Sequence, residues 1–211
     1  ALAFFLGGLY ERGQADLIPF FNFHTWLYLF FVPAIAMRLW AEERKSGSIE
    51  LLLTQPITLW QAVLGKFFAA WIFIGIALVL TFPIWITVNY LGDPDNGAIV
   101  AAYLGSFLMA GGFLAVGSCM SALTRNQVIA FILATAVCFI LLLAGFPLVL
   151  SFVQGWAPQV LIDAVASLSM YAHFQSIVKG VLDLRDLLYF ATLSAFFLLS
   201  TTVVLDMRKS S

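Results

Sequence analysis

Long apolar runs without Asp, Glu, Lys or Arg dominate the chain. They cover residues 17–37, 67–89, 97–124, 126–162 and 187–205. A transmembrane helix needs about 20 predominantly apolar residues, so most of these runs have the length of one span. The run over 126–162 is too long for a single span, and part of it must turn or lie at the membrane surface. The pattern therefore predicts a bundle of membrane helices.

Composition agrees with this pattern. The chain is 63% hydrophobic and 10% charged, with 21 Phe and 6 Trp, and its mean hydropathy is +1.01. These values exclude a soluble globular domain and predict a single all-α integral membrane domain over 1–211. The apolar stub 1–10 is too short to span, and we interpret it as the end of a first span that lacks its beginning. A cleaved signal peptide is the alternative. The expected spans are then 1–10, 17–40, 58–90, 97–123, 127–150 and 187–205.

The stretch AEERKSGSIELLLTQ interrupts this pattern with four consecutive charges, Glu42 to Lys45. One charged side chain at the bilayer centre costs roughly 2.5–3.5 kcal/mol, so the cluster must lie in water. The apolar positions that follow recur at helical spacing, and Pro56 ends the segment. We therefore expect a short amphipathic helix over 41–56. Thr58 and Gln61 have the spacing of a capping box and are expected to open the next span.

The distribution of basic residues predicts the orientation. With spans alternating across the membrane, only Arg12, Lys179 and Arg185 fall on one side. The other side carries Arg38, Arg44, Lys45, Lys66, Arg125, Arg208 and Lys209. By the positive-inside rule the charged cluster and both termini are cytoplasmic. The segment 158–186 is then outside, and we expect short interfacial or re-entrant helices there, with an apolar stripe of Phe174, Ile177, Val178 and Val181.

Polar and small residues within the spans have packing interpretations. Ala101, Gly105, Gly111, Ala115 and Gly117 favour close helix approach, within one subunit rather than in a dimer seam. Cys119 and Cys138 have no metal-ligand spacing and are expected to pack helices. The isolated His24 and His173 are expected to form hydrogen bonds rather than to bind a metal. The balance of 10 basic and 11 acidic residues gives no reason to expect nucleic acid.

Catalytic chemistry is not evident in the sequence. It contains no phosphate-binding loop of the Walker type, no His-Glu-x-x-His and no Gly-x-Ser-x-Gly. The apolar runs also lack the ionisable groups from which ion-coupling sites are built. We therefore expect a non-catalytic subunit without a cofactor of its own. If the protein does work, a partner protein must then supply the energy, and the charged stretch is its candidate docking surface.

The same stretch carries a family resemblance. EERKSGSIELLLTQPITLWQAVLGK resembles the segment between the second and third spans of type-2 ABC exporter permeases. MRLWAEERKSGSIELLLT, LGDPD, LTRNQ and HFQSIVKGVLDLRDLLYF resemble the gliding-motility-associated (Gld-type) subfamily. The resemblance implies a coupling helix seated in a groove of a separate ATP-binding subunit. The implied coupling residues are Glu42, Glu43, Arg44, Lys45, Gly47, Ser48, Glu50 and Leu53. A solvated turn that only enforces topology is the alternative.

The resemblance also implies the function. The expected protein is the membrane half of an ATP-driven exporter in a bacterial inner membrane, paired with a second copy or a paralogue and with two ATPase subunits. An amphipathic or polymeric substrate suits its apolar path. The alternative is mechanotransmission, in which the chain drives a periplasmic partner or an accessory membrane subunit through His173, Lys179, Asp183, Arg185 and Asp186. An ATP-independent channel or membrane enzyme is disfavoured by the uncharged spans.

Overall fold

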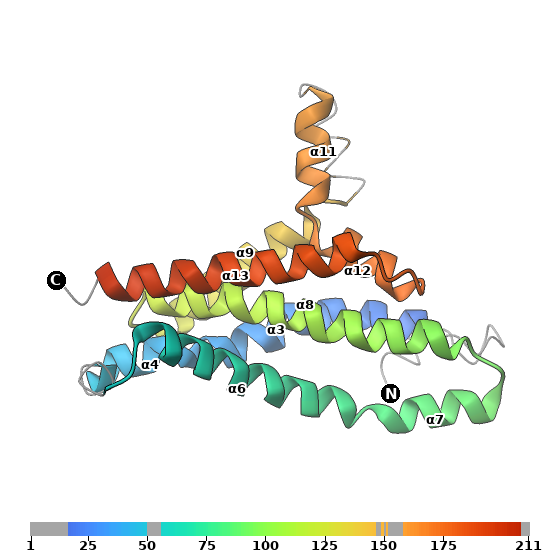
Figure 1. Ribbon diagram of the computed structural model, residues 1–211, viewed down its shortest axis with the longest axis horizontal. Coiled ribbons are helices and arrows are strands. Elements are labelled where there is room, and N and C mark those ends of the chain that lie inside the picture. The colour runs from blue at the N-terminus through green and yellow to red at the C-terminus, as the bar shows by residue number, and fades with distance from the viewer. Residues whose placement is uncertain (1–16, 50–55, 147–148, 150, 152–157, 208–211) are drawn as a thin grey trace. The chain divides into compact units, whose positions relative to one another are not determined.

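The computed structural model describes residues 17–49, 56–146, 149, 151 and 158–207, and the regular elements in this part of the chain are α-helices (Figure 1). They are α3 (Ile18–Ala36), α4 (Arg38–Ser46), α6 (Leu59–Val79), α7 (Phe82–Leu91), α8 (Asn96–Leu123), α9 (Gln127–Leu143), α11 (Gln159–Ser167), α12 (Met170–Val178) and α13 (Leu184–Met207).

The apolar runs of the sequence form the long helices. Among the described residues, four helical stretches are long and apolar enough to cross a membrane: Ile18–Ser46, Leu59–Leu91, Asn96–Leu123 and Leu184–Met207. The apolar helix Gln127–Leu143 is shorter. The all-α membrane architecture is therefore confirmed. The expected end of a first span over 1–10 lies outside the described residues, so the count of six spans stays a prediction.

Two of the expected spans are divided. The second, expected over 17–40, bends at Met37, where α3 ends and α4 begins. The third, expected over 58–90, is split into α6 and α7 at Leu80 and Thr81. Pro83 lies in the first turn of α7, where the lack of a backbone N–H costs nothing. Thr81 Oγ1 donates to the carbonyl of Leu78 at 2.6 Å, which satisfies one acceptor at the end of α6.

Two boundaries also differ from the predicted ones. The fifth helix ends at Leu143, before the expected residue 150. Just beyond it, Gly145 lies so close to Ser169 that a Cβ atom would be 2.5 Å from its side chain. The hydroxyl of Ser169 donates to the carbonyl of Leu142 at 3.3 Å and satisfies an acceptor in the last turn. The last helix begins at Leu184 rather than at 187, because Asp183 Oδ1 accepts the backbone N–H of Arg185 at 3.1 Å.

The chain forms two compact units. The first comprises Ala1–Leu27, Ile74–Met109 and Leu141–Leu188. Its core pairs Phe21 with Tyr103 edge to face, with ring centroids 5.1 Å apart. His24, which is 6% exposed, lies against Phe20 and Phe21 and places Nδ1 3.5 Å from Ser106 Oγ. The expectation that this histidine forms a hydrogen bond is therefore confirmed.

The second unit comprises Tyr28–Phe73, Ala110–Ile140 and Tyr189–Ser211. Here α8 approaches α6 and α3 at glycines. A Cβ atom on Gly111 would lie 2.9 Å from Nε1 of Trp71, and one on Gly117 would overlap Ala36. Small residues thus permit the close contacts between helices of one chain that their spacing predicts. Cys119 and Cys138 are buried and free.

Candidate functional site

The charged cluster lies on α4, not on a separate helix over 41–56. α4 begins at Arg38, contains Glu42 to Lys45 and ends before Gly47, whose φ of 75° places it in the left-handed region. A glycine adopts this conformation without the steric cost of a Cβ atom, so it ends the helix. Helical backbone resumes at Ser48 and Ile49. The predicted helix is therefore divided at Gly47.

One hydroxyl from α8 completes the bend between α3 and α4. The first N–H groups of a helix have no intrahelical acceptor, and here Ser121 Oγ accepts from the N–H of Trp40 at 3.1 Å and of Ala41 at 3.0 Å. The same hydroxyl donates to the carbonyl of Met37 at 2.9 Å. Ser121 is fully buried. A single side chain thus satisfies three backbone groups that the bend leaves unpaired.

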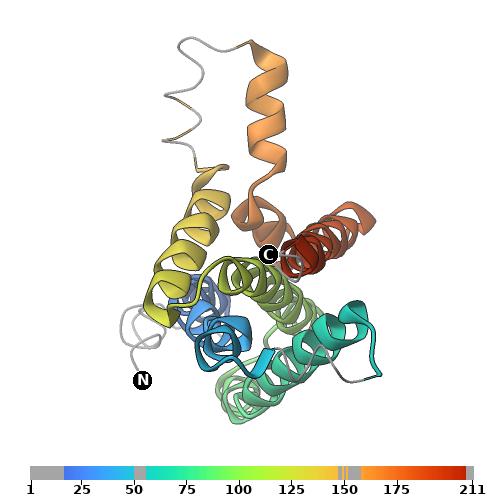
Figure 2. The same ribbon diagram turned by 90° about the vertical axis from the view of Figure 1, so that its left-hand side faces the viewer.

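Trp40 fixes α4 to the same part of α8. Its side chain is fully buried, and its indole Nε1 donates to Ser118 Oγ at 3.0 Å. Figure 2 shows α4, in light blue, beside the end of α8, in yellow-green. A buried indole needs a partner for its N–H, and Ser118 supplies it. We refer to Trp40, Glu43, Arg44, Lys66, Ser118 and Ser121 together as the α4 junction.

Lys66 joins α6 to α4. Its ammonium forms an ion pair with Glu43, donates to the carbonyl of Leu39 at 2.8 Å and lies 4.1 Å from the ring centroid of Trp40. Lys66 follows the start of α6 by about 10 Å along the helix axis, at 1.5 Å per residue. In the sequence Lys66 contributes only to the charge balance, yet it is the last charge before a long apolar run and is therefore the residue most in need of a partner.

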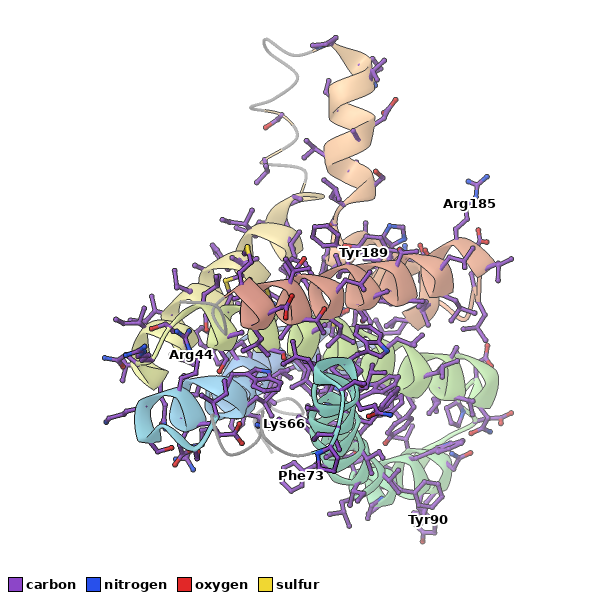
Figure 3. The ribbon with its side chains drawn as sticks, turned by 60° about the vertical axis from the view of Figure 1, so that its left-hand side comes forward. Arg44, Lys66, Phe73, Tyr90, Arg185 and Tyr189 are labelled. Atoms are coloured by element: carbon purple, nitrogen blue, oxygen red, sulfur yellow. The ribbon has the colours of Figure 1, made fainter. Side chains whose placement is uncertain are left out.

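Arg44 contacts the other end of the junction. Its guanidinium donates from Nη1 to the carbonyl of Ala122 at 2.5 Å, in the last turn of α8. A cation at this position interacts favourably with the negative end of the helix dipole and with carbonyl groups that have no intrahelical donor. Figure 3 labels Arg44 and Lys66, the two basic side chains that hold α4 to its neighbours.

The predicted coupling residues therefore divide into two groups. Glu43 and Arg44 are partly buried and bind α6 and α8, whereas Glu42, Lys45 and Gly47 are exposed. Glu42 and Lys45 are three positions apart and share one face of α4. Ser48 is partly buried, and its hydroxyl lies 2.8 Å from that of Ser46. Glu50 and Leu53 lie outside the described residues. The structure thus separates side chains that hold α4 from side chains that α4 presents.

The predicted outer surface divides in a similar way. His173 of α12 places Nδ1 2.6 Å from Asp186 Oδ1 of α13 and Nε2 3.0 Å from the carbonyl of Ser167. Lys179, Asp183 and Arg185 are exposed, and Arg185 extends away from α13 in Figure 3. His173 and Asp186 are thus structural partners that tie α12 to the start of α13. In the described part of the chain, no cluster of three His, Cys, Asp or Glu side chains offers a metal site.

The apolar stripe of α12 is covered by protein. Phe174 and Ile177 are fully buried, and a Cβ atom on Gly105 of α8 would lie 2.8 Å from Ile177. Val181 lies beyond the end of α12 and is 59% exposed. Phe174, Ile177 and Val178 of the predicted stripe are therefore covered by protein, and the lack of a side chain at Gly105 lets α8 lie against Phe174 and Ile177.

Comparison with known proteins gives the family. No curated protein matches the chain. The sequence profile of the ABC-2 family of transporter proteins matches residues 7–207, nearly the whole chain. Membrane proteins of this family typically work with an ATP-binding subunit. The long apolar helices of the structure agree with a membrane protein. The chain therefore belongs to the ABC-2 family of transporter proteins, as a multi-pass permease subunit of an ABC transporter.

Proposed function

We propose that the exposed face of α4 receives the movement of the ATP-binding subunit and that the α4 junction passes it to α6 and α8. The observation that carries this proposal is the division of the charged cluster. Glu42 and Lys45 are exposed on α4, while their neighbours Glu43 and Arg44 bind Lys66 and the end of α8. A partner that binds the exposed face therefore pulls on a helix that is fastened to two others.

The contacts of α4 with α6 and α8 explain why it suits the transmission of movement. Its contacts comprise an ion pair, a buried indole with a hydrogen bond, and the Ser121 hydroxyl. Contacts of this kind hold side chains in one geometry, so the helix moves as a rigid body rather than bending locally. Exposed charges contribute to register and association rate more than to affinity, which suits a surface that engages in every ATPase cycle.

The direct test uses the permease with its ATP-binding subunit. We expect Glu42→Lys to lower permease-stimulated ATPase activity severalfold, because it reverses a charge that the partner contacts, while membrane insertion and thermal stability are retained. Asp93→Lys is the matched control, since it reverses an exposed negative charge outside α4 and outside the predicted outer surface. The double variant with Glu42→Lys and Lys45→Glu reverses both exposed charges. If it stimulates the ATPase as strongly as the unchanged permease does, the proposal is wrong.

We further propose that this chain is a non-catalytic subunit and that ATP and Mg²⁺ bind to its partner. In vesicles that contain both subunits, activity should then survive the collapse of proton and sodium gradients. It should vanish when the catalytic glutamate of the ATPase is neutralised. Loss of activity with an ionophore at saturating ATP contradicts this assignment and supports secondary transport.

We propose that the complex pairs two permeases, as copies or paralogues, in a bacterial inner membrane and exports an amphipathic or polymeric substrate. The positive-inside pattern supports a cytoplasmic α4 and cytoplasmic termini. The segments that resemble gliding-motility-associated permeases support that subfamily. Mechanotransmission is the second candidate, supported by the exposed charges of Lys179, Asp183 and Arg185. Substrate movement in vesicles that hold only permease and ATPase supports export, whereas ATP hydrolysis without it supports mechanotransmission.

A further inference from the structure

We propose that the first unit contains a binding site for one zwitterionic phospholipid, with phosphate beside Lys179 and ammonium beside Asp95. The site is a cavity of about 210 Å³ formed by the start of α3, the start of α8 and the end of α12. This assignment goes beyond energy coupling and does not depend on it.

The cavity has an apolar floor and a charged rim. Phe21, Ile99, Ala102 and Val178 line it and are each at most 5% exposed. Asp95 and Lys179 also line it and are exposed. A ligand that satisfies both parts must be apolar at one end and carry charge at the other, which describes an amphiphile. One acidic and one basic side chain match a headgroup of zero net charge.

The structure fixes the carboxylate of Asp95 and the backbone that carries Lys179. Asp95 Oδ1 accepts the backbone N–H groups of Gly97 at 2.9 Å and Ala98 at 3.2 Å, which fixes the carboxylate at the start of α8. Lys179 follows α12 directly, and the next residue, Gly180, lies against Ala98. The ammonium of Lys179 has no hydrogen-bond or ion-pair partner among the described residues. A phosphate would supply that partner and form a charge-assisted hydrogen bond.

The depth of the cavity agrees with a lipid. Asp95 precedes α8, one of the helices with the length and composition of a membrane span, so it lies where headgroups lie. Ala102 is about 10 Å further along the same helix, at 1.5 Å per residue, and reaches the acyl region. Ligand pockets that enclose a drug-sized molecule measure about 300–1,000 Å³. This smaller, partly open cavity would hold the upper part of the acyl chains, with the remainder in the bilayer.

Native mass spectrometry of the detergent-solubilised permease tests the site without the ATPase. The probes are phosphatidylethanolamine, phosphatidylglycerol and diacylglycerol with identical acyl chains, at equal concentrations. We expect each chain to retain one phosphatidylethanolamine, roughly two- to fivefold better than phosphatidylglycerol or diacylglycerol. This ratio corresponds to the free energy of one exposed ion pair. Lys179→Glu should abolish this preference, whereas Arg185→Glu, an exposed charge outside the cavity, should leave it unchanged.

A second pair of variants tests the apolar floor. Ala98→Leu fills part of the cavity and should lower retention of all three lipids, whereas Val100→Leu, on the exposed face of α8, should not. Equal retention of diacylglycerol or phosphatidylglycerol overturns the zwitterionic assignment. If neither Lys179→Glu nor Ala98→Leu changes the retention of the lipids, the proposed site is wrong. Free phosphoethanolamine carries the headgroup without acyl chains. If an equal concentration of it displaces the lipid, the apolar floor contributes nothing to binding, and the proposed site is also wrong.

Discussion

Lys66 and Glu43 form an ion pair that fastens α6 to α4, with side chains that are 22% and 30% exposed. The pair belongs to a set in which the same ammonium also contacts a carbonyl and the face of Trp40. A lysine with these partners is satisfied at a depth along α6 where an unpaired charge would be costly. The relationship makes Lys66 a positioning residue for α4.

A double-mutant cycle measures that role. We expect Glu43→Gln and Lys66→Met each to lower both stability and permease-stimulated ATPase activity. Their coupling energy should be about 0.5–1 kcal/mol, at the upper end for partly exposed pairs. Thermal unfolding in detergent and stimulated ATPase activity are the measurements. A coupling energy of zero contradicts the assignment, and Arg125→Met, an exposed cation outside the α4 junction, serves as the matched control.

Ser121 should be necessary for the bend between α3 and α4. Ser121→Ala leaves two N–H groups and the carbonyl of Met37 without their partner. Buried unsatisfied groups cost about 1–3 kcal/mol each, and relaxation at the bend reduces the sum, so we expect a loss of about 2 kcal/mol in unfolding free energy. Ser121→Thr should retain much of the unfolding free energy, because it keeps the hydroxyl. Ser46→Ala, at an exposed position, is the control, and an equal effect there would refute the prediction.

Two glycines should respond to alanine with opposite signs. A Cβ atom on Gly105 would lie 2.8 Å from Ile177, whereas one on Gly65 would meet nothing within 4 Å. We expect Gly65→Ala to stabilise α6 by up to about 1 kcal/mol, because it removes the entropic cost of a helical glycine. Gly105→Ala should destabilise the protein, and Ile177→Ala should relieve part of that effect when the two are combined. Strictly additive effects in this cycle, measured by thermal unfolding, would contradict the contact.

Cysteine labelling tests the orientation and the covering of α12. Lys179 is exposed and Ile177 is fully buried. We expect Lys179→Cys to react with a membrane-impermeant maleimide from the periplasmic side and Ile177→Cys to react slowly from either side. The background is a chain with Cys119 and Cys138 replaced by alanine. Labelling of Lys179→Cys only after the cytoplasmic face is opened would reverse the proposed topology.

Local rules predicted much of the fold. The hydropathy pattern predicted the positions of the long helices. The Thr58–Gln61 capping box is also confirmed. The N–H of Thr58 donates to Gln61 Oε1 at 3.0 Å, and the N–H of Gln61 donates to Thr58 Oγ1 at 3.3 Å. These features depend on residues within one or two helical turns, so they are visible in the sequence.

The partners of the α4 junction could not be predicted in the same way. Ser118 and Ser121 appear as two more small residues in an apolar run, and nothing local indicates that a hydroxyl there reaches the backbone of α4. The end of α4 before Gly47 could not be predicted, because a glycine after a charged run suits either a loop or a helix end. Burial of the α12 stripe was missed because lipid and a neighbouring helix select the same apolar side chains.

The hydroxyl that completes the α3–α4 bend comes from a residue 81 positions after Trp40. At a synthesis rate of about 5–20 residues per second, the ribosome adds Ser121 roughly 4–16 s after Trp40. During that interval the nascent chain holds α4 without its partner on α8. The order of translation therefore means that the α3–α4 bend cannot reach its final form before α8 has emerged.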